Sequence, residues 1–333
     1  MNRVFDCHVN ATLARLCNSK PLEPFTSTFT RDALLAMRKS LSSLLNALSD
    51  RDALVSEARN NGLSSVRTKY KLNATFMDDL LELSMMEYDA RNYLLACELL
   101  KAFRLLASVD SITVSFDKQL SALWGSLCCN LILEEWDSSC QLALSLNNSL
   151  ESLMIGRYRK SIGYHMAALV NWMPVLLFLA PSMNKQLLSL FLSEHCISVI
   201  LTTESHLKPF VAAAILASTD LDLGRARAIV SDLAGLDDPL IRVASAIFFN
   251  ASPEKLISEI GRAKSVTGVL ARFAAQDLEK CAFSKLFRVM EKSQMSISPD
   301  YMQKYFSGNE PGNFKTVTGW CQAASEAVVE SLM

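Results

Sequence analysis

The chain has 333 residues, of which half are hydrophobic and a fifth are charged, and its formal net charge is −1. This balance excludes a disordered chain, and it provides no overall field that would attract nucleic acid or an anionic membrane. Gly and Pro are scarce, at 11 and 9, which is typical of a helical protein, and the length favours two structural parts.

Helical periodicity dominates the chain from end to end, and no stretch of alternating polarity is long enough to predict a strand. Capping residues, glycines and prolines mark the helix ends. In chain order, the sequence predicts a helix at 30–48 and a second helix that ends at 60–62. Further helices are predicted at 70–90, 93–107, 118–134, 136–147, 154–172, 185–192, 207–218, 223–234, 239–249, 253–263, 274–291, 299–305 and 314–332.

Two of the predicted hairpins form a faint internal repeat, because residues 80–103 match residues 123–146. Leu80 falls on Leu123, Tyr93 on Trp136, Cys97 on Cys140 and Leu100 on Ala143. One helical hairpin cannot bury its apolar face alone and stacks on the next. The repeat therefore predicts a solenoid with a long surface suited to binding macromolecules.

The end of the chain has a different pattern. Asp238-Pro239, Ser252-Pro253 and Ser298-Pro299 each place a capping side chain before a proline at the first helical position. After 274–291 comes a short helix, a polar loop and a longer helix, the order of a helix-turn-helix without a β-wing. We therefore expect an all-α, TPR/HEAT-like helical-repeat solenoid that ends in a helix-turn-helix, with parts at 1–72, 73–273 and 274–333.

Catalytic and metal-binding motifs are missing from the sequence. It has no phosphate-binding loop, dinucleotide fingerprint, zinc-protease helix or nucleophile elbow. The nine cysteines include no C-x-x-C, and the four histidines do not cluster, so we expect buried reduced thiols and no metal, cofactor or catalytic residue. The N-terminus does not have the form of a secretory signal, which favours an intracellular protein.

A membrane helix is the competing interpretation for 161–184, which lacks Asp, Glu, Lys and Arg. Asn171 and Pro174 interrupt this apolar stretch. A solenoid helix buried on both faces explains the same composition, and we favour that interpretation.

Nucleic-acid reading by the terminal helix-turn-helix is a second alternative. The helix expected at 314–332 has Lys315 as its only base, against Glu326 and Glu330. Phosphates would repel such a helix, so we expect no sequence-specific DNA binding. Its surroundings are instead rich in aromatics, which suit core packing or protein contacts. The candidate subunit interface is Tyr305, Phe306, Phe314 and Lys315.

The segment SALWGSLCCNLILEEWDSS (Ser121–Ser139) resembles the e subunit of eukaryotic translation initiation factor three. In that family a Leu-Trp-Gly is followed by an apolar helix and a Trp-Asp corner. The order and spacing of further segments extend the resemblance over most of the chain: Tyr88–Tyr93, Ile162–Phe178, Asp238–Asn250 and Ile297–Phe306.

The resemblance implies a PCI domain, which is a helical solenoid ending in a winged helix. It also implies a cytoplasmic, non-catalytic scaffold subunit of initiation factor three, with the c, d and l subunits as partners and attachment to the small ribosomal subunit. The family continues into wing strands and a C-terminal helix, whereas this sequence ends at Met333. We therefore expect a partial winged helix.

The alternatives within the PCI class are a scaffold subunit of the proteasome lid or the COP9 signalosome, and a nucleic-acid-binding protein of the mRNA-export type. The order of segments around Leu123-Trp124-Gly125 favours initiation factor three. The modestly basic stretch Arg51–Lys71 supplies the candidate for ribosomal RNA contact through phosphates, at Arg67, Lys69 and Lys71.

Overall fold

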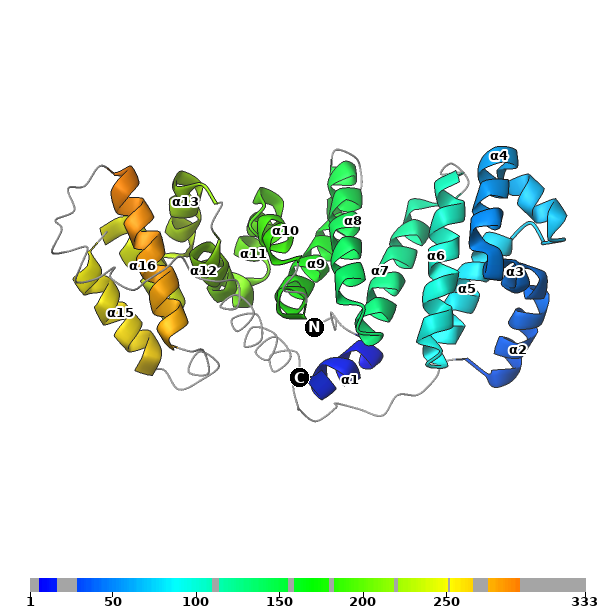
Figure 1. Cartoon of the computed structure of the whole chain (residues 1–333), viewed down its shortest axis with the longest axis horizontal. Coiled ribbons are helices and arrows are strands. Elements are labelled where there is room, and N and C mark those ends of the chain that lie inside the picture. Colours follow the sequence, from blue (N-terminus) through cyan, green and yellow to red (C-terminus); the bar gives the residue numbers. More distant parts are fainter. Residues whose placement is uncertain are drawn as a thin grey trace. The chain divides into compact units, whose positions relative to one another are not determined.

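The computed structural model describes residues 6–16, 29–109, 114–154, 159–179, 183–218, 221–250, 252–265 and 275–293. Over these ranges all regular structure is helical and no strand occurs, so the chain has an all-α helical-repeat fold (Figure 1). The helices form two compact units, one within Phe5–Ser149 and one within Leu150–Met333. The division into 1–72, 73–273 and 274–333 stays a prediction.

The N-terminal unit contains two helical hairpins, which follow the helices α1 to α4. Its elements are α1 (Cys7–Leu16), α2 (Arg31–Ser40), α3 (Ser42–Ala47), the 3-10 turn η1 (Leu48–Asp50), α4 (Arg51–Lys69), α5 (Phe76–Asp89), α6 (Tyr93–Val109), α7 (Phe116–Ile132) and α8 (Trp136–Met154), whose last residues pass into the second unit.

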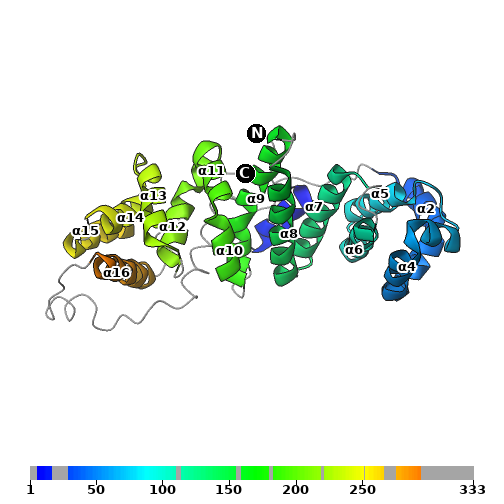
Figure 2. The same ribbon diagram turned by 90° about the horizontal axis from the view of Figure 1, so that it is seen from above.

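Successive helices of this unit pack side by side, α5 on α6 and α6 on α7, with α4 also on α6 and α2 on α5 (Figures 1 and 2). The matched repeat positions Leu80 and Leu123, Cys97 and Cys140, and Leu100 and Ala143 are all buried. At Gly125 a Cβ atom would lie 3.1 Å from Leu100 Cδ1, so α6 and α7 approach closely there. This close approach gives the Leu-Trp-Gly motif a packing reason.

The α5–α6 and α7–α8 corners repeat the same backbone conformation. Arg91 has φ 64° and Glu134 has φ 62°, in the left-handed region that few non-glycine residues adopt. Each residue ends a Schellman motif, in which two backbone N–H groups bond back into the last helical turn. The bonds are Asn92 N to Glu87 O (2.8 Å), Arg91 N to Tyr88 O (2.9 Å), Glu135 N to Asn130 O (2.8 Å) and Glu134 N to Leu131 O (3.2 Å).

Two expectations for the first helices need correction. The predicted helix at 30–48 starts as expected, since Thr30 Oγ1 accepts from Ala33 N, but it breaks at Leu41 into α2 and α3. Leu41 turns into the core there, and the Ser40 hydroxyl bonds back to Met37 O. The stop predicted at 60–62 is a kink: Gly62 has φ 80°, and helix resumes to Lys69.

The described part of the C-terminal unit begins and ends with a long helix and has shorter helices between them. Its described elements are α9 (Arg159–Leu179), α10 (Asn184–Phe191), α11 (Glu194–Thr202), the 3-10 turn η3 (Ser205–Leu207), α12 (Lys208–Ala217), α13 (Leu223–Leu233), α14 (Pro239–Ser245), the π-helical turn η4 (Ala246–Asn250), α15 (Pro253–Ser265) and α16 (Ala275–Lys292). Helix α11 has no counterpart among the predicted helices.

Most of the apolar stretch at 161–184, for which a membrane helix was the competing interpretation, lies in α9. Its residues from Leu169 to Leu177 are all buried, with Pro174 inside the helix. Asn171 donates to Ala167 O and to Glu204 Oε2 (3.0 Å), so its amide is satisfied within the unit. In the part of the chain that the structure describes, no helix has the length and apolarity to cross a membrane.

Side-chain caps define several helix ends in this unit. Asp238 Oδ1 accepts from Leu240 N and Ile241 N, and Ser252 Oγ accepts from Lys255 N, as predicted. Helix α13 ends near Gly235 as expected, but Gly235 does not adopt the left-handed conformation.

At the C-terminal ends of two helices, a basic side chain from a later element donates a hydrogen bond to a backbone carbonyl. Arg225 Nη2 donates to Leu192 O after α10, and the buried Lys285 Nζ donates to Ser218 O after α12. Lys285 thereby fixes α16 against α12. The third proline cap, Ser298-Pro299, and the helices predicted at 299–305 and 314–332 lie outside the described residues.

Candidate interaction surface

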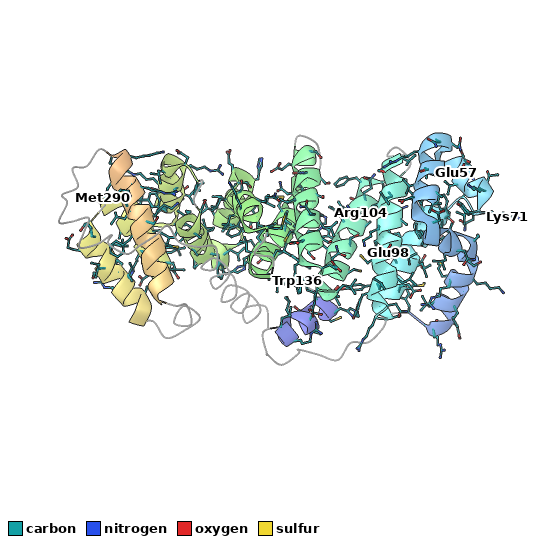
Figure 3. All side chains as sticks on the ribbon, in the orientation of Figure 1. Glu57, Lys71, Glu98, Arg104, Trp136 and Met290 are labelled. Carbon is teal, nitrogen blue, oxygen red and sulfur yellow. The ribbon has the colours of Figure 1, made fainter. Side chains whose placement is uncertain are left out.

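The three basic residues singled out from the sequence lie at the corner between α4 and α5. Arg67 and Lys69 belong to the last turn of α4, and Lys71 follows with φ 52°. This corner is a third Schellman motif, since Leu72 N bonds to Arg67 O (2.9 Å) and Lys71 N to Thr68 O (3.3 Å). All three side chains are exposed, and Figure 3 shows Lys71 at the outer edge of the unit.

Glu57 neutralises one of these three cations. Its Oε2 lies 3.0 Å from Lys69 Nζ, while Oε1 accepts from Ser65 Oγ (2.6 Å) and Asn61 Nδ2 (2.9 Å). These bonds, that from Ser65 first, lower the pKa of Glu57 to about 2, so Glu57 is ionised at any physiological pH.

Arg67 and Lys71 have no carboxylate within ion-pair distance in the described chain. The corner thus presents two uncompensated charges about one helical turn apart and a third that is paired. Such an array suits the phosphates of a nucleic-acid backbone and carries no means of reading bases.

A second feature, which sequence reasoning missed, is the docking of α1 on the hairpin corners. Asp6 Oδ2 accepts from the Tyr88 hydroxyl (2.7 Å), and His8 Nδ1 lies 2.8 Å from the Tyr93 hydroxyl. The rings of His8, Tyr88 and Tyr93 meet edge to face, with centroids 4.8–5.7 Å apart. At the next corner Arg15 Nη2 contacts Glu134 Oε1 at 2.5 Å.

Helix α1 therefore contacts both hairpin corners, and it also packs on α7 (Figure 1). Burial lowers the pKa of His8, against Asp6 and Asp89, which raise it, so the docked imidazole is held neutral. The signal for this contact was present in the sequence as Asn92-Tyr93, but nothing in the N-terminal pattern paired it with residues 6–15.

A buried ion pair joins α2 to the first corner. Glu87 is fully buried, and its carboxylate accepts from Arg38 Nε (2.5 Å) and Nη2 (2.6 Å) and from Asn92 Nδ2 (2.8 Å). At the second corner the equivalent position is Asn130, whose Oδ1 accepts from the Cys97 thiol (3.0 Å).

The described residues contain no group of three or more His, Cys, Asp or Glu side chains that could hold a metal ion. Burial raises the pKa of Cys140 to about 12 and that of Cys196 to about 11, so both thiols stay protonated and are poor nucleophiles. The predicted interface residues Tyr305, Phe306, Phe314 and Lys315 lie outside the described residues.

These features define an all-α helical-repeat protein whose candidate functional site is an exposed interaction surface. No family model matches the chain. Over 175 residues it is 24% identical to the E subunit of eukaryotic translation initiation factor 3 from Neurospora crassa, covering 52% of this chain and 38% of the relative. The corresponding protein of Aspergillus clavatus is 23% identical over 217 residues, covering 61% and 46%.

The plant relative gives the same result: the E subunit from Arabidopsis thaliana is 21% identical over 154 residues, covering 46% of this chain and 33% of the relative. The matched part of the chain thus spans less than half the length of these curated relatives. The chain is a divergent protein similar to the E subunit of initiation factor 3, as the motifs around Leu123-Trp124-Gly125 predicted.

Proposed function

We propose that this protein is a non-catalytic scaffold subunit of a cytoplasmic translation initiation factor 3 complex. It binds sister subunits, with the c, d and l subunits as the expected neighbours, and supports attachment of the complex to the small ribosomal subunit. The observation that carries this proposal is the similarity to the E subunit across fungi and a plant, together with a helical-repeat fold.

The mechanism follows from the architecture. Stacked hairpins hold exposed side chains in fixed positions, so binding partners meet a pre-organised surface and lose little free energy in ordering it. The helix-turn-helix that the sequence predicts at the end of the chain, with Tyr305, Phe306, Phe314 and Lys315, is proposed to dock against a sister subunit. Ribosomal RNA contact is proposed for Arg67, Lys69 and Lys71, through phosphates only.

Sedimentation tests the proposed function. A tagged copy in native lysate is run through a sucrose gradient, and the fractions are analysed by mass spectrometry. Comigration with the small ribosomal subunit and with initiation factor 3 subunits is expected. Peaks that hold proteasome-lid or COP9 signalosome subunits, with no material at the small ribosomal subunit, would overturn the proposal.

The RNA contact is tested by removing the two uncompensated charges. Arg67→Gln with Lys71→Asn keeps a residue that tolerates a positive φ at position 71. The matched control is Arg31→Gln with Lys39→Gln, which removes two exposed charges from α2 of the same unit. We expect only the first pair to lower ribosome association. It should also reduce the slope of log affinity against log salt concentration by the amount expected for about two phosphate contacts. If both pairs of substitutions changed ribosome association equally, the proposed RNA contact would be contradicted and the scaffold role would stand.

A further inference from the structure

An exposed aromatic stands beside an uncompensated cation in the C-terminal unit. Phe249 is 42% exposed, although the three residues before it, Ala246, Ile247 and Phe248, are all buried. The Arg227 guanidinium on α13 lies 5.6 Å from the centre of the Phe249 ring. A large aromatic left in water costs free energy that burial in a complex would recover.

The backbone at this point is unusual. Phe249 belongs to η4, the π-helical turn that continues α14. Turns of this kind are rare and are found frequently at functional sites, since the wider turn redirects side chains. Here the turn buries three consecutive residues and presents the fourth.

Arg227 has no carboxylate within ion-pair distance among the described residues, and its one recorded contact is the Phe249 ring. Its neighbour Arg225 points elsewhere, to the Leu192 carbonyl. The charge on Arg227 is therefore free to pair with an acidic group that comes from outside the chain.

The charge of the surrounding residues favours a protein over a nucleic acid as the binding partner. Residues 221–263 hold five bases against six acids, so this region has no field that attracts phosphates. Arginine and aromatics are enriched among the residues that dominate protein interfaces.

We propose that Arg227 and Phe249 form a docking site for a protein partner whose contacting segment carries a carboxylate next to an apolar side chain. The carboxylate pairs with Arg227 and the apolar group covers Phe249. This inference rests on the proposed scaffold function, which makes the partner a sister subunit, and it names a surface outside the terminal helix-turn-helix.

Site-specific photo-crosslinking in the native complex tests the site. Benzoylphenylalanine replaces Phe249 in the full chain, and the control places it at Tyr164 on α9, an aromatic that is 73% exposed in the same unit. The expected result is a crosslink from position 249 to an acidic and apolar peptide of a sister subunit, well above the yield from position 164. Crosslinks to RNA alone, or equal yields at the two positions, would overturn the proposal.

A charge exchange makes the test specific for the ion pair. Arg227→Glu is expected to lower the crosslink yield about tenfold, and a Lys in place of the partner's crosslinked acid should restore it. A yield unaffected by Arg227→Glu would also overturn the proposal. Sedimentation separates the two levels: if the protein with benzoylphenylalanine at position 249 comigrates with initiation factor 3 but crosslinks no more than the control at position 164, the site falls and the scaffold function stands.

Discussion

The two hairpin corners of the N-terminal unit share one backbone but differ in side-chain chemistry. Positions 91 and 134 both take a left-handed conformation, and the backbone bonds around them match one for one. Inside the corners, Glu87 is replaced by Asn130, so a buried charge stands where the second corner has a neutral amide. The repeat therefore preserves chain geometry more strictly than residue identity.

What the two corners retain is a buried side-chain oxygen that accepts a hydrogen bond from a helix earlier in the chain. Glu87 accepts from Arg38 on α2, and Asn130 accepts from Cys97 on α6. Each contact joins its hairpin to an earlier helix and satisfies a buried acceptor that water cannot reach. The comparison teaches that both hairpins use the same buried position for a polar contact with an earlier helix, although the chemistry of that contact differs.

The largest expected effect comes from breaking the charged corner. Arg38→Met leaves the Glu87 carboxylate buried without its cation, and we expect a loss of about 3 kcal/mol in the free energy of unfolding. This value is at the low end for a buried pair, because the Arg38 side chain is 37% exposed. Urea denaturation of the purified chain measures it.

The matched control for this substitution is Arg31→Met, which removes an exposed arginine from the same helix. It should change stability by less than about 0.5 kcal/mol. A loss at Arg38 no greater than the loss at Arg31 would contradict the role given to the buried pair.

A substitution at Asn130, in the α7–α8 corner, should destabilise the protein less. Asn130→Ala removes a hydrogen bond from a thiol, a weak donor, so we expect a loss of about 1 kcal/mol in the free energy of unfolding. The same denaturation series measures it. A loss at Asn130 larger than that at Arg38 would reverse the order that the comparison predicts.

Glycine tests whether the two corners truly share a backbone. Replacing Arg91 by Gly or by Ala removes the same side chain, but only Gly adopts a positive φ without cost. The Gly variant should be more stable than the Ala variant by about 1 kcal/mol. The same difference is expected between Glu134→Gly and Glu134→Ala. Differences that disagree between the two positions would show that the corners are not equivalent.

The smallest effect is a pH dependence of α1 docking. Burial holds the pKa of His8 below 6.5 in the folded state, so the unfolded chain takes up a proton that the folded chain resists. Stability should therefore fall as the pH drops below about 6.5. The His8→Phe protein keeps a ring against Tyr88 and should lose less stability between pH 7.5 and 5.5. Identical pH profiles would contradict a neutral, buried His8.

Much of this fold could be predicted from local signals. The corner aromatics Tyr93 and Trp136 each begin a helix, and the Asp238-Pro239 and Ser252-Pro253 caps bond as expected. These features depend on residues a few positions apart, so the sequence contains their causes.

Contacts between distant segments could not be predicted. The docking of α1 joins residues more than 80 positions apart, and the Arg38–Glu87 pair spans 49. The break at Leu41 and the run of helix past Gly62 are likewise decided by core packing rather than by propensity. The basic corner was found from its charges, but the neutralisation of Lys69 by Glu57 depends on how α4 folds.

The scaffold role is tested most directly by the stoichiometry of the native assembly. The chain is tagged at its own locus, purified at physiological salt, and its companions are quantified by mass spectrometry. The account predicts initiation factor 3 subunits in amounts equal to the chain itself. Equal amounts of proteasome-lid or COP9 signalosome subunits, with initiation factor 3 subunits at background, would contradict it.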